Sequence, residues 1–318
     1  MANPAENNVK NESPAQENKM GVMPVGKLLF TMSLPIMISM LVQALYNVVD
    51  SMFVARVSEN ALTALSMAFP IQNLMIAVST GLGVGLNAVL SRALGAKDEK
   101  GVNRAATNGI MLLFICGLVF MLGGATLVRP YFEMQTDIEE IVTSGIDYTS
   151  IVMMGSMGVF MQILFERLLQ STGRTMLTMF SQGVGAIINI IFDPILIFNF
   201  NMGVAGAAYA TVGGQILSMI VGLCILFFGN HAIALEFKGF RFHGKTMKDI
   251  YVVGLPSIVM NAIGTLMTMA MNGILAGFSA VAVNVFGVYF KLQSFVFMPV
   301  FGLTQGLMPI MGYNYGAR

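Results

Sequence analysis

Long apolar segments separated by short polar stretches run through the chain from Lys27 to its C-terminus. Eight of these segments reach about 20 residues, the length at which an α-helix crosses a ~30 Å hydrocarbon core. Glycine and proline punctuate them, which favours packed helices over the strands of a barrel. The expected membrane spans are 30–54, 61–90, 106–128, 142–166, 176–199, 204–228, 250–278 and 282–311. The pattern therefore predicts an all-α, multi-pass membrane protein.

The composition agrees with a chain that lies mostly in a lipid bilayer. Hydrophobic residues make up 56% of the 318 residues and charged residues 10%, against about 25% charged in soluble domains. The formal net charge of +1 gives no electrostatic basis for binding nucleic acid. We expect the bilayer as the partner and no nucleic acid.

The distribution of basic residues predicts the orientation of the spans. Residues 1–26 are polar and read as a disordered cytoplasmic tail. An even number of spans puts both ends of the chain on one side. Fourteen Lys and Arg residues then lie on the side of the N-terminus, whereas the other side holds Arg56 and Arg129. The positive-inside rule places the N-terminus in the cytoplasm.

A repeat appears when the chain is compared with itself at an offset of 221 residues, which aligns 33–97 with 254–318. The matched positions include Leu34-Pro35 with Leu255-Pro256, Gln72 with Gln293, Gly81 with Gly302, Gly85-Leu86 with Gly306-Leu307, and Gly95-Ala96 with Gly316-Ala317. Both copies cross in the same direction, as in the parallel repeats of secondary transporters.

The repeat predicts two lobes with a cavity between them. A complete N-lobe of six spans occupies 27–229, a cytoplasmic linker 230–249, and the first two spans of a second lobe 250–318. Four helices of the second copy are missing, so the chain looks C-terminally truncated. The missing helices, or a partner chain, are expected to be needed.

Two carboxylates fall inside expected spans, where ionisable groups are costly and suggest function. Asp50 lies late in the first span and Asp193 late in the fifth, so both belong at a similar depth in the outer half of the membrane. Asn189 precedes Asp193 by one helical turn, and Thr211 enters the sixth span at that depth. These four residues are our candidates for binding a coupling cation, Na⁺ or H⁺. The competing interpretation is that both carboxylates are solvated at the outer interface or cap helix ends.

Other polar residues within spans are weaker candidates. Gln43, Tyr46 and Asn47 lie within two turns of Asp50 and are candidates for the wall of a substrate cavity, with packing as the default. Lys291 lies deep in the eighth span, where a substrate role and a structural tether are equally plausible. The neighbouring Glu166 and Arg167 are interpreted as a solvated or structural ion pair, with a transport role as the alternative.

No motif for catalysis or for a resident cofactor occurs in the sequence. It contains no Gly-x-x-x-x-Gly-Lys-Ser/Thr phosphate loop, and no serine–histidine arrangement suited to hydrolysis. We therefore expect no enzyme activity, no catalytic residues and no cofactor other than the coupling ion.

At these same positions the chain resembles the multidrug and toxic compound extrusion (MATE) family, in its bacterial MepA-like and DinF-like branches. The resemblance covers about residues 24–318. It rests on SLPIMISMLVQALYNVVDSMFVAR (33–56), SRALGAKD (91–98), FERLLQSTG (165–173), NIIFDPILIF (189–198), GVAGAAYATV (203–212) and GLTQGLMPIMGYNYGAR (302–318).

The resemblance implies twelve helices in two lobes, a bacterial plasma membrane, and export of small organic, usually cationic, compounds in exchange for Na⁺ or H⁺. It also implies that Asp50, Asn189, Asp193 and Thr211 match the cation site of the first lobe. Asp50 aligns with Met271 in the second copy, so coupling would rest on the first lobe. Two alternatives remain: a non-transporting truncated fragment, and a flippase for lipid-linked sugars with similar architecture.

Overall fold

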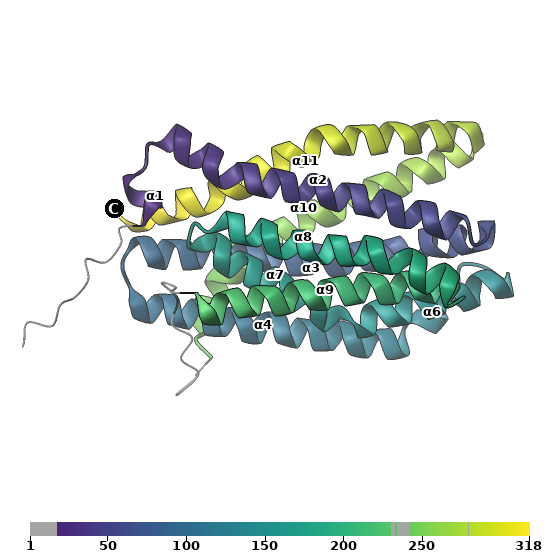
Figure 1. The fold of residues 1–318 in the computed structure, drawn as a ribbon, viewed down its shortest axis with the longest axis horizontal. Helices are drawn as coiled ribbons and strands as arrows, with labels where there is room; N and C mark the ends of the chain where they lie inside the picture. Colours follow the sequence, from purple (N-terminus) through teal and green to yellow (C-terminus); the bar gives the residue numbers. More distant parts are fainter. Residues whose placement is uncertain (1–17, 230–232, 234–241, 279) are drawn as a thin grey trace, which may run out of the picture.

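The chain folds into a bundle of long, roughly parallel helices (Figure 1), described by a computed structural model for residues 18–229, 233, 242–278 and 280–318. Within these residues the elements are all helical. Seven helices are long and apolar enough to cross a membrane, and the bent pair α6 and α7 forms an eighth span. The predicted all-α membrane fold is confirmed. The elements are α1 (Lys19–Val22), α2 (Val25–Ala55), α3 (Glu59–Gly95), α4 (Glu99–Thr126), α5 (Val128–Glu133), α6 (Glu139–Met154), α7 (Ser156–Ser171), α8 (Thr175–Pro194), the π-helix η1 (Ile195–Asn199), α9 (Gly203–Phe228), α10 (Gly244–Ala276) and α11 (Ala280–Gly316).

Local sequence signals explain where several helices begin. Ser58 accepts a hydrogen bond from the amide of Ala61 at 3.0 Å and caps α3, and Asp98 caps α4 through Gly101 at 3.0 Å. Between α7 and α8 the chain turns at Gly173 with φ +82°, a conformation that glycine adopts without steric cost. These short caps and turns keep successive spans antiparallel.

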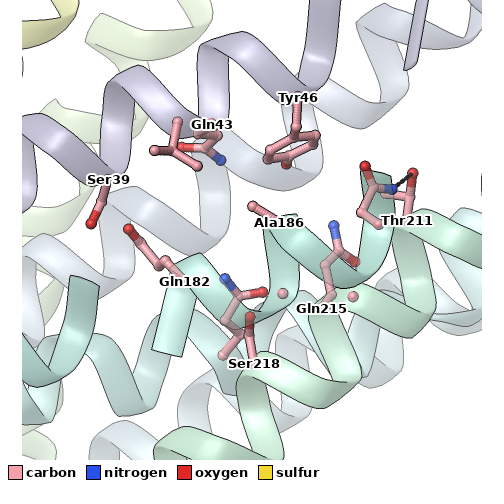
Figure 2. Close-up of a pocket in the computed structure, with 13 residues that line it drawn as sticks. Ser39, Gln43, Tyr46, Gln182, Ala186, Thr211, Gln215 and Ser218 are labelled. Carbon is pink, nitrogen blue, oxygen red and sulfur yellow. Dashed lines mark hydrogen bonds between the residues drawn. The ribbon is translucent and has the colours of Figure 1, made fainter. Parts of the chain in front are cut away.

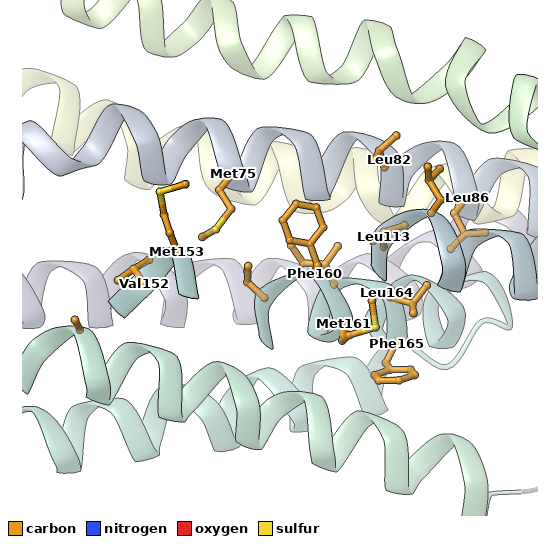
Figure 3. Packing of buried hydrophobic residues seen from close by; sticks show 14 of the residues in the cluster. Met75, Leu82, Leu86, Leu113, Val152, Met153, Phe160, Met161, Leu164 and Phe165 are labelled. Atoms are coloured by element: carbon orange, nitrogen blue, oxygen red, sulfur yellow. The ribbon is translucent and has the colours of Figure 1, made fainter. Parts of the chain in front are cut away.

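The hydrophobic core lies around α3, the most deeply buried of the seven single-helix spans, and the buried helix α7. Met75, Leu82 and Leu86 of α3 pack against α4, α6 and α7 through residues such as Leu113 and Phe160 (Figure 3). At Gly155 the α6–α7 span bends by 43°, and a Cβ there would overlap Val212 of α9. α3 is therefore a central helix of the described bundle, packed against α4, α6, α7, α10 and α11.

The segment expected to be the end of a disordered tail differs from that expectation. Residues 1–17 lie outside the described residues, whereas 18–26 form α1 and the start of α2. Met20 is 2% exposed and packs with Leu28, Met32 and Ile310. Residues 20–25 are largely apolar, and burying Met20 and part of Met23 stabilises this short helix against α2 and α11.

The repeat found in the sequence is also a repeat in space. α10 packs along α3, and α11 packs along α2 and α3. A Cβ on Gly81 would meet Ile258, and a Cβ on Gly302 would meet Met37. The two contacts are equivalent in the repeat, because Gly302 lies 221 positions after Gly81 and Ile258 lies 221 positions after Met37. Similarly, Gly85 lies against Ile250 and Gly254, and Gly306 against Ser33. The repeated glycines are thus the positions where the two copies touch.

The bundle has two ends, named here by what each carries. The terminal end carries α1 and the C-terminal Arg318, and the opposite end carries the connections α2–α3, η1–α9 and α10–α11 (Figure 1).

Candidate functional site

Two carboxyl groups, Asp50 on α2 and Asp193 at the end of α8, come together near the opposite end of the bundle. The two groups are close enough to influence each other electrostatically, and their residues are 8% and 0% exposed. Within the described structure, both carboxyl oxygens of Asp193 and Oδ1 of Asp50 have no hydrogen-bond donor. Two buried anions at this distance repel strongly in a low dielectric. The pair therefore has acceptor capacity for a cation or a shared proton.

The other two predicted residues lie beside this pair. Asn189 is 3% exposed and Thr211 of α9 is 7% exposed, and Asn189 Nδ2 donates to Thr211 Oγ1 at 3.4 Å. The Nδ2 group of Asn189 is used by Thr211. Its Oδ1 oxygen receives no hydrogen bond from the described residues and can therefore accept one from a ligand. One turn along α8, this amide oxygen adds a neutral acceptor to the two carboxylates.

The backbone is irregular directly after Asp193. Pro194 has no N–H, so it cannot bond the carbonyl of Ile190 as a helix requires. The chain continues in the wider π form, in which the amide of Phe200 donates to the carbonyl of Ile195 at 3.0 Å. Single π turns are common at functional sites, and here one follows a buried carboxylate directly.

A polar cavity of about 430 Å³, including the space at its mouth, lies between α2, α7, α8 and α9. Figure 2 shows Gln43 and Tyr46 of α2 on one side and Gln182, Gln215 and Ser218 on the other. The complete lining is Ser39, Val42, Gln43, Tyr46, Gln162, Gln182, Gly185, Ala186, Asn189, Thr211, Gly214, Gln215 and Ser218.

The four cavity candidates from the sequence have different outcomes. Gln43 and Tyr46 line the cavity. Asn47 lies on the exposed face of α2 and is not among the lining residues. The side chain of Lys291 falls outside the described residues.

Three lining glutamines, Gln162, Gln182 and Gln215, were missed by the sequence reasoning. A signal for them existed, because polar residues recur along one face of each helix. On α8 the polar positions of the face are 182, 189 and 193, with the small Ala186 between them, and on α9 they are 211, 215 and 218. This i, i+4, i+7 spacing predicts a polar stripe within an otherwise apolar span.

From the sequence, Glu166 and Arg167 are interpreted as a solvated or structural ion pair; they are not solvated, and no ion pair joins them among the described residues. The two residues are 4% and 5% exposed, and their side chains bond different partners. Glu166 accepts from Gln162 at 2.9 Å and from Gln182 at 2.7 Å, whereas Arg167 donates to the side chains of Gln170 and Gln305, each at 2.7 Å. Successive residues on a helix project about 100° apart, so the two charges face different neighbours.

Comparison with known proteins agrees with this architecture. The sequence profile of the MatE family matches residues 35–195 and 256–318. The multidrug export protein MepA of Staphylococcus aureus is 24% identical over 300 residues, covering 93% of this chain and 66% of its own length. A crystal structure of MATE in complex with MaL6 aligns with a TM-score of 0.91 at 25% identity, over 95% of this chain and 68% of that one.

The third comparison is with a transporter whose structure was determined in a stated conformation. A multidrug resistance MATE family transporter of the MOP superfamily, described in its outward-facing conformation, aligns with a TM-score of 0.86 at 26% identity, over 92% of this chain and 65% of that one. The chain spans about two thirds of the length of these relatives. From the family profile and the shared fold, the chain belongs to the MatE family of multidrug and toxic compound extrusion transporters.

Proposed function

We propose that the chain provides the ion-coupled lobe of an antiporter that exports small organic, mainly cationic, compounds by alternating access. The observation that carries this proposal is the buried pair Asp50 and Asp193, set one helical turn from Tyr46 and Asn189, which line the cavity. The pair and the cavity are neighbours on α2 and α8, so an ion at the pair acts on the helices that form the cavity wall.

The cavity lining supports a cationic substrate. Gln162, Gln215 and Asn189 each present a buried side-chain oxygen with no donor among the described residues. Oxygen acceptors of this kind stabilise positive charge and N–H donors. A flippase for lipid-linked sugars needs basic side chains to hold a pyrophosphate, and the described lining contains neither Lys nor Arg.

Coupling follows from the difference in affinity between two states. A Na⁺ ion bound by the carboxylates, with Asn189 and Thr211 as neutral oxygen ligands, stabilises whichever arrangement of α2 and α8 holds the four residues together. A proton shared by the two carboxyl groups acts in the same way. In this scheme the coupling ion is a transported substrate, and its entry from outside displaces the organic cation.

We place the chain in a bacterial plasma membrane with its terminal end in the cytoplasm. The loops and helix ends of the terminal end carry Arg92, Lys97, Lys100, Arg104, Arg174 and Arg318, whereas the opposite end carries Arg56 and Arg129. The relatives extend beyond this chain, so the proposed transport cycle includes further helices or a partner chain. The described lobe itself supplies the ion and substrate contacts.

The substitution Asp193→Asn tests this coupling. With the chain in lipid nanodiscs, we expect Na⁺ or acid to weaken the binding of tetraphenylphosphonium about tenfold, a typical coupling between two sites. Asp193→Asn should still bind the cation but lose this ion dependence, as measured by equilibrium dialysis. Asp147→Asn is the matched control, because Asp147 is an exposed carboxylate on α6. Full ion dependence in Asp193→Asn would contradict the proposal.

A further inference from the structure

Glu166 is a buried carboxylate to which the coupling scheme assigns no role. It lies on α7 behind the wall of the cavity and is not itself among the lining residues. Its two oxygens are held by two residues that do line the cavity. Gln162 Nε2, one turn earlier on α7, donates to Oε1 at 2.9 Å, and Gln182 Nε2 on α8 donates to Oε2 at 2.7 Å.

This arrangement fixes which way the two amides face. A carboxylate only accepts hydrogen bonds, whereas a primary amide has a donor end and an acceptor end. Both glutamines must therefore turn their NH₂ groups to Glu166 and their carbonyl oxygens away from it. Gln162 Oε1 is buried and has no donor among the described residues. A free acceptor at this position is otherwise costly, so it points to a ligand that supplies positive charge or a donor.

The neighbouring cation makes its printed hydrogen bonds elsewhere, so the oxygens of Glu166 stay with the two glutamines. Arg167 is committed to Gln170 and to Gln305 of α11, on another face of α7. The carboxylate therefore contributes its negative charge to the cavity side, where Gln215 and Asn189 present further free oxygens.

Building on the proposed substrate cavity, we propose that Glu166 is a positioning residue that sets the charge preference of this cavity. By orienting Gln162 and Gln182, it turns their acceptor oxygens toward the space between α2, α7, α8 and α9. The ligand class selected is the organic cation. Without the carboxylate, either amide is free to rotate and present its donor end, which suits an anionic or neutral ligand.

The test uses two ions of the same shape and opposite charge, tetraphenylphosphonium and tetraphenylborate. Both are measured by equilibrium dialysis against the purified chain in nanodiscs, with empty nanodiscs subtracted. Replacement of Glu166 by Gln keeps the size and removes the charge. We expect Glu166→Gln to bind the cation about tenfold more weakly, the effect of one charge-assisted hydrogen bond, while binding of the anion is unchanged or stronger.

Two further variants complete the design. Glu99→Gln removes an exposed carboxylate in the first turn of α4 and should leave both affinities unchanged. Gln162→Met removes one oriented oxygen at a half-buried position, so it tests the same idea if Glu166→Gln fails to fold. It should lower the affinity for the cation several-fold and spare that for the anion.

The outcomes separate this inference from the function on which it rests. An equal loss of both affinities in Glu166→Gln means that Glu166 only ties α7 to α8, and overturns the inference. So does an unchanged preference for the cation, which leaves the proposed function standing. A wild-type chain that binds neither ion overturns the proposed function itself. A shift in charge preference in Glu166→Gln and Gln162→Met, with none in Glu99→Gln, supports the inference.

Discussion

The two ends of the contact between the repeat copies differ sharply in how closely their helices approach. At the terminal end a Cβ on Gly85 would overlap the backbone of Ile250, and one on Gly95 would overlap the backbone of Tyr313. Toward the opposite end, Gly264 of α10 has nothing within 4 Å of a Cβ, and Leu266 and Ile274 are exposed. In Figure 1 the α10–α11 hairpin correspondingly diverges from α2 toward the opposite end.

This difference shows where the described structure is held closed. The carboxyl pair lies near the end where the copies diverge, and the glycine contacts lie at the other end. Under the orientation we propose, with the terminal end in the cytoplasm, this arrangement would be closed inward and open outward. Alternating access then requires the glycine contacts to separate, because packed interfaces switch between discrete states and do not deform continuously. Substitutions at the terminal end should therefore have larger effects than matched ones at the opposite end.

The largest effect is expected at a repeated glycine. Gly85→Ala places a methyl group against the backbone of Ile250, which cannot rotate away as a side chain can. Overpacking of this kind should lower the free energy of unfolding by about 3 kcal/mol. Unfolding of the detergent-solubilised chain in increasing SDS measures it. Gly264→Ala is the control, since its methyl group enters open space and should stabilise α10 by about 1 kcal/mol. Equal effects at the two glycines would remove the distinction between the ends.

A smaller effect is expected at α1, which joins the two copies across the terminal end. Met20 packs on Leu28 and Met32 of α2 and on Ile310 of α11, and its carbonyl accepts from Asn314 at 3.2 Å. Beside it, burial and the charge of Arg174 lower the pKa of Lys19. Met20→Ala should cost about 2 kcal/mol.

Local opening is the direct measure of this contact. Hydrogen exchange of residues 18–23 should accelerate in Met20→Ala by the factor that corresponds to the lost free energy. Val22→Ala is the control, because Val22 is 60% exposed and its truncation should leave exchange unchanged. Unchanged exchange in Met20→Ala would mean that α1 is held by its backbone bonds alone.

The sequence predicted the helices and the repeat because both can be found by inspecting the sequence alone, either within one segment or by comparing two segments. Apolar runs of membrane length gave the spans, and the offset of 221 residues paired Gly81 with Gly302 and Gly85 with Gly306. What the sequence could not show is that these glycines touch the partner copy, since contact depends on how each helix is rotated about its axis. The 43° bend at Gly155 was also missed, and the close contact of Gly155 with Val212 on another helix could not be seen from the sequence.

At the candidate site, too, some residues could be identified from the sequence and others only from the packing of the helices. Asp50 and Asp193 stand out in the sequence because a carboxylate in an apolar span is costly, and the structure places them together. Glu166 stands out equally but was misinterpreted, because its neighbour in sequence is Arg167 and its partners in space are glutamines. Glutamine carries no charge, so its cost in a span is lower and its signal weaker. Which side chains bond Glu166 depends on how α7 and α8 pack together, and the sequence alone does not show this packing.

The smallest predicted effect concerns a hydrogen bond between α7 and α11. Arg167 of α7 donates to Gln305 of α11 at 2.7 Å and keeps a second acceptor in Gln170. Because that second bond survives, Gln305→Met should cost only about 1 kcal/mol, measured by the same SDS titration. The exposed Thr304→Val serves as the control, since the Thr304 hydroxyl bonds the carbonyl of Val300 within its own helix. If Gln305→Met matched Gly85→Ala in cost, the guanidinium rather than the glycine contacts would hold the terminal end closed.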